Sequence, residues 1–368
     1  MLEQETIEKL KKIEYALVPG TIYTDTPKLK PEYYFHWEDF KEEKGIHHYY
    51  VVGVRGAGKT YNGLKWLNEV KKGLMIRRTD PELEIMTDPQ HNPFNPLIEE
   101  GDIESGCVKR KGKKLYKMYA GPEGDEEYIG DGVALNTFAT GRSADYSYFE
   151  NVFWDEFIKQ PDQQNFKDEG GAWNNALETI TRNRHHVNVV AVANSNDIYN
   201  PVFKELGVVN QLEKLLDKAQ TATQCLTDYK RHIKIILYKP TDEFISFRKC
   251  LGLWDLTEGT NYAAMAYNNQ FVANDFNDCE YHSIIGYKPL FNIDDYAVWK
   301  KKGSNELYVT YAQFEGKGNN TYYSHYPIDC ENLVERYYNT IRNRYLKHLI
   351  TFESYDIKRR LLELFKLL

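Results

Sequence analysis

Hydrophobic residues along this chain form short apolar runs, separated by polar stretches that are long enough for helices. The runs at 49–52, 74–76, 152–154 and 189–193 contain almost no polar side chains, which is typical of strands buried on both faces of a parallel sheet. A helix-compatible stretch at 61–72 follows the first run. The pattern therefore predicts an α/β fold.

The residues after the first run match a phosphate-binding loop. They read G-V-R-G-A-G-K-T and fit the pattern G-x-x-x-x-G-K-[ST]. The glycines let successive N–H groups turn toward phosphate oxygens, and the helix that opens near Lys59 adds its positive dipole end. Lys59 is expected to reach the β- and γ-phosphates during catalysis, and Thr60 to offer its hydroxyl to Mg²⁺. We expect ATP to contact Gly53, Arg55, Gly56, Ala57, Gly58, Lys59 and Thr60. A structural glycine turn is the alternative.

Two acids follow the third apolar run. A buried parallel strand delivers side chains to its carboxyl edge, and here it ends in Asp155 and Glu156. Asp155 is expected to hold the Mg²⁺ shell through water, and Glu156 to orient and polarise the attacking water. The alternative is a surface Asp-Glu pair at a strand end. Together with the phosphate loop, the pair favours nucleotide hydrolysis.

Polar residues also end two other runs. Asn194 ends the run at 189–193 and is expected to sense the γ-phosphate, or else only to cap its strand. The run at 74–76 lies between the two motifs and ends in Arg77-Arg78, which we place at the same sheet edge. A strand between the two motif strands is expected of hydrolases with a catalytic glutamate.

A basic cluster at 181–186 precedes the strand that ends in Asn194. Arg182 and Arg184 either form a solvated helix end or act on the active site of a neighbouring subunit. The second role is chemically reasonable because guanidinium groups match phosphate oxygens and stabilise transition-state charge.

Composition limits the remaining choices. A chain of 368 residues suits two domains, or one large domain with an appendage. Its net charge of −7 argues against a generally basic surface, so any nucleic-acid contact must come from local clusters. The five cysteines lack C-x-x-C spacing, which argues against a zinc site or a disulfide framework. No secretory or membrane-spanning segment is evident, so we expect no membrane association and a cytoplasmic place of action.

Basic side chains gather in one expected hairpin, at 108–115. Such a tip can follow a phosphate backbone, although a solvated hairpin tip fits equally well. Lys159, just past the acid pair, is a further candidate for DNA contact. The candidates on the hairpin are Lys109, Arg110, Lys111, Lys113 and Lys114.

Taken together, these motifs resemble those of the DNA encapsidation (genome-packaging) ATPases of small short-tailed bacteriophages. The resemblance covers roughly residues 45–275 and depends on the order of the motifs. They are G-V-R-G-A-G-K-T, I-R-R-T-D-P-E-L, V-F-W-D-E-F-I, R-N-R, N-S-N-D-I-Y-N-P-V-F and G-T-N-Y-A-A-M-A-Y-N-N-Q-F. The resemblance implies a terminase-like P-loop ATPase of the additional-strand, catalytic-glutamate type.

The resemblance also implies a function. It implies a homo-oligomeric ring, with a pentamer favoured, that pumps double-stranded DNA through the portal into a preformed capsid. Such a motor works in the host cytoplasm, transiently attached to the procapsid, and in some relatives a structural RNA takes part. By position, Lys59, Thr60, Asp155 and Glu156 match the family's nucleotide and metal residues. Arg182 matches its trans-acting arginine, and Arg142 lies where the family carries a basic residue near the subunit interface.

The expected domain layout has four parts. Residues 1–44 form an N-terminal extension, longer than the family's usual lead-in, and 45–210 form the ATPase domain. Residues 211–275 are interpreted as a linker or lid. Residues 276–368 form a smaller α+β domain, either a nuclease-like fold of the ribonuclease H type without catalytic acids or a different small fold.

Three features of the N- and C-terminal parts bear on function. The aromatic cluster at 33–37 either packs on the ATPase core or stacks on a base. The strand expected at 281–287 has no acid, and Asp294, Asp295 and Asp329 do not form an obvious metal set. The amphipathic helix at 356–365 either packs on its own domain or docks on the capsid or portal.

Rival functions remain at this stage. A small-molecule or nucleoside kinase has no need of a water-activating glutamate, which disfavours that interpretation. A nucleotide-dependent switch would bind ATP with little turnover, and a helicase would need single strands. A ring ATPase that translocates double-stranded DNA is the favoured interpretation.

Overall fold

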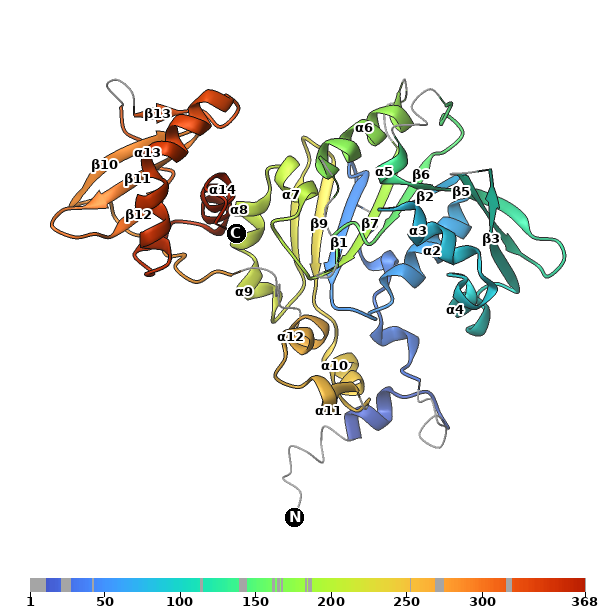
Figure 1. The fold of residues 1–368 in the computed structure, drawn as a ribbon. Helices are drawn as coiled ribbons and strands as arrows, with labels where there is room; N and C mark the ends of the chain where they lie inside the picture. The colour runs from blue at the N-terminus through green and yellow to red at the C-terminus, as the bar shows by residue number, and fades with distance from the viewer. Residues whose placement is uncertain are drawn as a thin grey trace, which may run out of the picture. The chain divides into compact units, whose positions relative to one another are not determined.

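The computed structural model describes residues 11–20, 28–41, 43–112, 115–138, 144–160, 163, 166, 168–182, 184, 187–251, 253–268, 275–315 and 320–367 (Figure 1). The chain divides into two compact units. Unit 1 consists of 1–207 with 214–273, and unit 2 consists of 208–213 with 274–368.

Unit 1 is built on a nine-stranded sheet with the order β3-β4-β5-β2-β6-β7-β1-β9-β8. The six strands from β5 to β9 in this order run parallel, while β3, β4 and β8 are antiparallel additions at the two edges. The parallel strands are β1 (His48–Gly53), β2 (Gly73–Arg77), β5 (Glu127–Ala134), β6 (Asn151–Asp155), β7 (Asn188–Asn194) and β9 (Ile233–Tyr238). The edge strands are β3 (Ser105–Lys111), β4 (Leu115–Gly121) and β8 (Gln224–Asp228). The α/β fold with a parallel sheet is confirmed.

The apolar runs of the sequence become the buried centre of this sheet. β2 and β6 are buried along their whole length, as expected for strands covered on both faces. Helix α2 (Lys59–Val70) packs on β6 and β7. Its Gly63 allows this close approach, because a Cβ there would lie 2.1 Å from the ring of Phe153.

Short helices fill the connections of unit 1. Helix α6 (Glu169–Thr181) connects the loop after β6 to β7. Further helices with described bounds are η2 (Pro31–Tyr33), η3 (Trp37–Asp39), α3 (Asp80–Glu84), η4 (Ile85–Thr87), η5 (Pro89–His91), α4 (Asn95–Glu99), α5 (Leu135–Phe138), α7 (Pro201–Glu205), α9 (Leu216–Ala219), α10 (Asp242–Lys249), α11 (Leu253–Thr257) and α12 (Asn261–Asn268).

The N-terminal segment is part of unit 1. Phe35 and Trp37 are almost fully buried, and their rings meet Tyr238 of β9 and Tyr49 of β1 edge-on, at centroid distances of 5.2 Å and 4.8 Å. Of the two interpretations of the cluster at 33–37, these contacts bear out packing on the core for Phe35 and Trp37.

The expected linker or lid at 211–275 needs correction. Strand β9 pairs with β1 along its full length, and β8 pairs with β9, so 224–238 complete the central sheet. Only α10, α11 and α12 follow the sheet before unit 2 begins. The expectation failed because β9 lies beside β1, and this long-range pairing leaves no local mark in the sequence.

Unit 2 contains a five-stranded mixed sheet in the order β13-β10-β11-β12-β14. Its strands are β10 (Tyr287–Ile293), β11 (Tyr296–Lys301), β12 (Leu307–Thr310), β13 (Thr321–Tyr322) and β14 (Ile350–Phe352). The strand expected at 281–287 is wrong, because β10 starts only at Tyr287. Tyr281 and Ile285 are 75% and 87% exposed, so apolar composition here does not reflect burial.

Helices α13 (Pro327–Tyr345), α14 (Tyr355–Leu364) and α8 (Val209–Glu213) accompany this sheet. Ile357, Leu361 and Leu362 of α14 lie in the core of unit 2, so the terminal helix packs on its own unit. Among the described residues, no helix is both long enough and apolar enough to cross a membrane.

Candidate active site

Three parallel strands end at one edge of the sheet and bring the candidate residues together. β1 ends at Gly53, whose register partner is Asn194 at the end of β7, and Asp155 ends the adjacent β6. β7 lies between the two motif strands, whereas β2 lies on the other side of β6. The inserted strand is therefore the one that carries Asn194.

The phosphate loop depends on left-handed backbone at two glycines. Gly56 and Gly58 have φ angles of 78° and 88°, which side-chain-bearing residues rarely adopt. Gly58 is also the N-cap of α2, so the free N–H groups of the helix start inside the loop. This geometry matches an anion site at a helix N-terminus.

Lys59 is held inside the loop by oxygen atoms. Its Nζ donates to the main-chain oxygens of Gly53 at 3.0 Å and Val54 at 2.6 Å, and to Oδ1 of Asn194 at 3.3 Å. Burial lowers the pKa of Lys59 to about 7, although the nearby carboxylates of Asp155 and Glu156 act to raise it. The lysine thus already lies where a phosphate would meet it, and Asn194 is in direct contact with it.

Thr60 and Asp155 form an oxygen pair suited to a hard cation. The Thr60 hydroxyl donates to Oδ1 of Asp155 at 3.0 Å. Burial raises the pKa of the Asp155 carboxyl, while Arg77 acts in the opposite direction. Among the described residues, no group of three or more His, Cys, Asp and Glu side chains could hold a metal. Mg²⁺ is commonly held by one or two protein oxygens together with substrate phosphates, and Thr60 and Asp155 would supply such oxygens.

One arginine bridges both acids. Arg77 Nη1 lies 2.5 Å from Oδ2 of Asp155, and Nη2 lies 2.8 Å from Oε2 of Glu156. Its Nε also pairs with Glu82 at 3.4 Å. Burial alone would lower the pKa of Arg77, but the three carboxylates outweigh it and the pKa is raised. The sequence predicts that Arg77 lies at this edge but indicates no role for it. The structure shows that its guanidinium neutralises the acid pair.

Glu156 occupies an unusual backbone position. Its φ of 55° lies in the left-handed region, which is uncommon for a residue with a side chain and is often found at functional sites. Gln160 donates to Oε1 of Glu156 at 3.4 Å, and 31% of the Glu156 side chain is exposed. The carboxylate therefore leaves the strand end at a sharp turn and remains accessible to solvent.

Arg78 supports the loop that follows the acids. It is fully buried and makes a two-pronged contact with Glu169 of α6, at 2.5 Å and 2.9 Å, and a third bond to Gln163 at 2.8 Å. This buried pair ties β2 to the start of α6.

The arginines proposed to act across subunits differ in their surroundings. Arg182 is exposed at the C-terminal end of α6. Arg184 instead donates to the main-chain oxygens of Tyr146, Ser147, Phe149 and Ile180, which favours a structural role within its own subunit. Arg142 lies outside the described residues.

The expected basic hairpin is confirmed as β3 and β4, which pair from Ser105 to Lys111. Lys109 lies over the ring of Tyr119, Arg110 pairs with Glu84, and Lys111 is exposed near the tip. Lys113 and Lys114 lie outside the described residues. Lys159 donates to the Gln163 oxygen at 3.2 Å. Contact of any of these side chains with DNA stays a prediction.

The sequence interpretation missed Arg248 of α10. A Cβ built on Gly56 would lie 3.3 Å from Arg248 Nη1 and 3.4 Å from its Cζ, so the guanidinium rests against the phosphate loop. Arg248 lies in the region expected to be a linker or lid, and no motif surrounds it. Only the fold of α10 back onto the loop reveals it.

Comparison with known proteins gives a consistent result. Residues 32–351 match the family described as podovirus DNA encapsidation protein (Gp16). The chain is 25% identical over 231 residues to the DNA packaging protein of Bacillus phage phi29, and 26% identical over 229 residues to that of Bacillus phage B103. Each alignment covers 61% of this chain, and the matched regions span 62% and 64% of those relatives.

Solved structures show a shared fold. The bacteriophage Phi-29 viral genome packaging motor assembly matches with a TM-score of 0.61 and 20% identity, over 91% of this chain and 99% of that one. The Phi-28 gp11 DNA packaging motor matches with a TM-score of 0.58 and 16% identity, over 89% of this chain and 95% of that one. At these identities, the likeness concerns the fold.

Proposed function

The chain belongs to the podovirus DNA encapsidation (Gp16) family, and from this membership we propose that it is an ATP-driven motor for double-stranded viral DNA. The motor moves DNA into a preformed capsid through the portal, in the host cytoplasm. The observation that carries the proposal is the meeting of Lys59, Thr60, Asp155, Glu156 and Asn194 at one sheet edge. A nucleotide hydrolase needs this combination of phosphate, metal and water-activating groups.

Binding of ATP begins at the loop. The N–H groups around Gly56 and Gly58 hold the phosphates, and Lys59 exchanges its main-chain oxygens for phosphate oxygens. Thr60 and Asp155 would hold Mg²⁺, which supplies charge neutralisation on the phosphates. Asn194, already bonded to Lys59, is placed to respond to the γ-phosphate.

Hydrolysis then depends on Glu156. Its carboxylate orients the attacking water and accepts its proton. Arg77 donates to Oε2 of Glu156, so this oxygen is not available to the attacking water until the ion pair is released. The Asp155 bond to the same guanidinium keeps Arg77 near the site during the exchange.

The finer architecture follows from the same family. β7 between β1 and β6 supports the additional-strand, catalytic-glutamate class of P-loop ATPase. We assign Arg182, exposed at the end of α6, as the residue that enters the neighbouring subunit's site in a homo-oligomeric ring, with a pentamer favoured. Unit 2 takes the role of a nuclease-like domain without cutting activity.

ATP turnover by the full chain, with and without double-stranded DNA, tests this proposal. Wild-type protein should hydrolyse ATP faster when DNA is present, and Glu156→Gln should bind ATP while losing turnover. Gln160→Ala, next to Glu156 but without a proton-accepting group, serves as the matched control and should retain most activity. Turnover that survives in Glu156→Gln contradicts the assignment, and unwinding of a forked duplex favours a helicase instead.

A further inference from the structure

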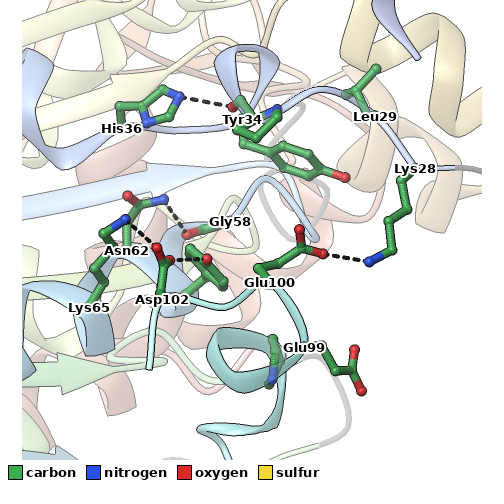
Figure 2. Close-up of a pocket in the computed structure, with 13 residues that line it drawn as sticks. Lys28, Leu29, Tyr34, His36, Gly58, Asn62, Lys65, Glu99, Glu100 and Asp102 are labelled. Atoms are coloured by element: carbon green, nitrogen blue, oxygen red, sulfur yellow. Dashed lines mark hydrogen bonds and ion pairs between the residues drawn. The ribbon is translucent and has the colours of Figure 1, made fainter. Parts of the chain in front are cut away.

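A cavity of about 480 Å³ adjoins the phosphate loop, within the size range of small-molecule sites. Its walls come from the N-terminal segment 28–36, from Gly58 and the first two turns of α2, and from α4 with the residues after it. Figure 2 shows the Tyr34 ring on one side of this cavity and the carboxylates of Glu100 and Asp102 on another. Gly58 belongs both to the wall of the cavity and to the phosphate loop.

The N-terminal segment is fixed to the loop by direct bonds. The N–H of Phe35 donates to the oxygen of Ala57 at 2.8 Å. Asn62 of α2 bridges the Phe35 and Gly58 oxygens. A Cβ on Gly58 would lie 3.4 Å from Cβ of Tyr34. Tyr34 is therefore held against the loop by the bonds of its neighbour Phe35 and by its own contact with Gly58.

The position of the cavity fits the rest of a nucleotide. Tyr61, which lines it, directly follows Thr60, so the cavity begins within one helical turn of the phosphate-binding groups. A triphosphate held by the loop must place its nucleoside in a neighbouring space. Among the described residues, this cavity shares a glycine with the loop and provides that space.

The walls of the cavity suit the flat ring of a base. Tyr34 offers an aromatic face, and its ring meets Phe244 of α10 edge-on at 5.7 Å, which keeps it in place. The carboxylates in the opposite wall already have cationic partners: Glu100 pairs with Lys28 at 2.9 Å and Asp102 with Lys65 at 2.8 Å. These ion pairs hold the polar wall in place, and the stacking surface of Tyr34 is the group that recognises the base.

We propose that this cavity holds the adenine and ribose of the bound nucleotide, and that 28–36 are part of the ATP site. The proposal rests on the function proposed above and deepens it. It gives the N-terminal segment, for which the sequence indicates no role, a direct part in nucleotide binding.

Binding of two ligands to the full chain tests the proposal, because ADP has a nucleoside and inorganic tripolyphosphate has none. Calorimetric titration with Mg²⁺ present should show Tyr34→Ala binding ADP about tenfold or more weakly, from the loss of stacking. Its affinity for tripolyphosphate should stay unchanged. Tyr34→Phe, which keeps the ring, should bind ADP like wild type. Tyr33→Ala, at the neighbouring tyrosine outside the cavity, is the matched control.

The outcomes separate the two claims. Equal weakening of both ligands in Tyr34→Ala, or of neither, overturns the base pocket while leaving the ATPase proposal intact. If wild-type protein binds neither ligand, the proposed function fails as well.

A second inference rests on Arg248 alone. Its guanidinium touches Gly56, and its Nε is buried without a hydrogen-bond partner. The same group lies over the ring of Tyr267, at 5.7 Å from the centroid. A half-buried guanidinium against the phosphate loop is matched by phosphate oxygens. We infer that Arg248 contacts the nucleotide phosphates within its own chain.

ADP and tripolyphosphate also test this inference, but here the affinities for both ligands should fall. Arg248→Gln, which removes the charge and shortens the side chain but keeps a polar end, should weaken ADP and tripolyphosphate alike, by about tenfold or more. Lys249→Ala is the matched control, because Lys249 lies over Trp254 at 4.7 Å instead of over the loop. Arg248→Lys should recover part of the affinity. Unchanged tripolyphosphate binding in a folded Arg248→Gln protein overturns the inference.

Discussion

Arg77 and Lys59 are the two cations at the centre of the candidate site. Arg77 neutralises Asp155 and Glu156, which would otherwise repel each other at adjacent positions. Lys59 is surrounded by oxygens and has a pKa lowered to about 7 by burial. Both cations occupy positions near those expected for the bound phosphates and metal. The candidate site is therefore held together by ion pairs and hydrogen bonds among its own residues.

Removal of Arg77 should destabilise unit 1. Arg77→Ala leaves Asp155 buried without its cationic partner, and loss of one partner from a buried pair costs about 3–5 kcal/mol. Arg110→Ala, which breaks an exposed pair with Glu84, is the matched control and should cost under about 1 kcal/mol. The free energy of unfolding in urea measures both. Equal losses would show that Arg77 is not a structural partner of the acids.

Lys59 predicts a pH effect on binding. Its pKa is about 7 in the free protein, and bound phosphates should raise it because they favour the charged amine. At a pH between the Lys59 pKa of the free protein and that of the complex, ADP binding must be accompanied by uptake of a proton. Titration calorimetry in buffers of different ionisation enthalpy should therefore show more uptake at pH 8 than at pH 6, where Lys59 is already charged. Uptake that does not increase with pH contradicts the lowered pKa.

At the scale of elements, local patterns predicted the strands but not all of their neighbours. The apolar runs gave β1, β2, β6 and β7, because burial on both faces leaves a mark in the sequence. The place of β7 between β1 and β6, and the addition of β8 and β9, depend on long-range pairing. The same limit applies to side chains: Arg77 meets Asp155 from 78 positions away, and nothing near Arg248 announces its contact with the loop.

Contact between α2 and β6 gives a prediction at this scale. Gly63→Ala would normally favour a helix by about 1 kcal/mol. Here the new methyl group would overlap the ring of Phe153, so the change should destabilise the protein by about 1–3 kcal/mol. Thermal unfolding measures the effect. Phe153→Leu should be less harmful in the Gly63→Ala background than alone, and strict additivity of the two changes would argue against the overlap.

The whole molecule consists of two units with separate cores, and the chemistry lies in unit 1. Four aspartates of unit 2 already have ion-pair or hydrogen-bond partners. Asp294, Asp295 and Asp356 all pair with Arg360, at 3.8 Å, 2.5 Å and 3.4 Å. Asp329, which the sequence considered with them, instead accepts the N–H of Tyr323 at 3.0 Å. Arg360 thus neutralises three carboxylates of unit 2, whereas a two-metal nuclease needs clustered acids that bind metal ions.

Unit 2 should therefore not cut DNA. Supercoiled plasmid incubated with the full chain and Mn²⁺ should remain uncut, because the guanidinium of Arg360 holds the acids. Arg360→Ala tests whether the acids alone suffice, and it should also leave the plasmid intact, since Asp329 is bonded elsewhere. Linear or nicked plasmid that appears with wild-type protein, and disappears in Asp294→Asn, would contradict the assignment.

The central claim is a ring in which one subunit completes the active site of the next. The direct measurement is ATP turnover of Glu156→Gln protein mixed with Arg182→Ala protein, compared with each variant alone. Each variant alone should be inactive, while mixed rings should regain turnover wherever an intact Glu156 faces an intact Arg182. A mixture no more active than its components, or normal turnover by Arg182→Ala alone, would contradict the shared site.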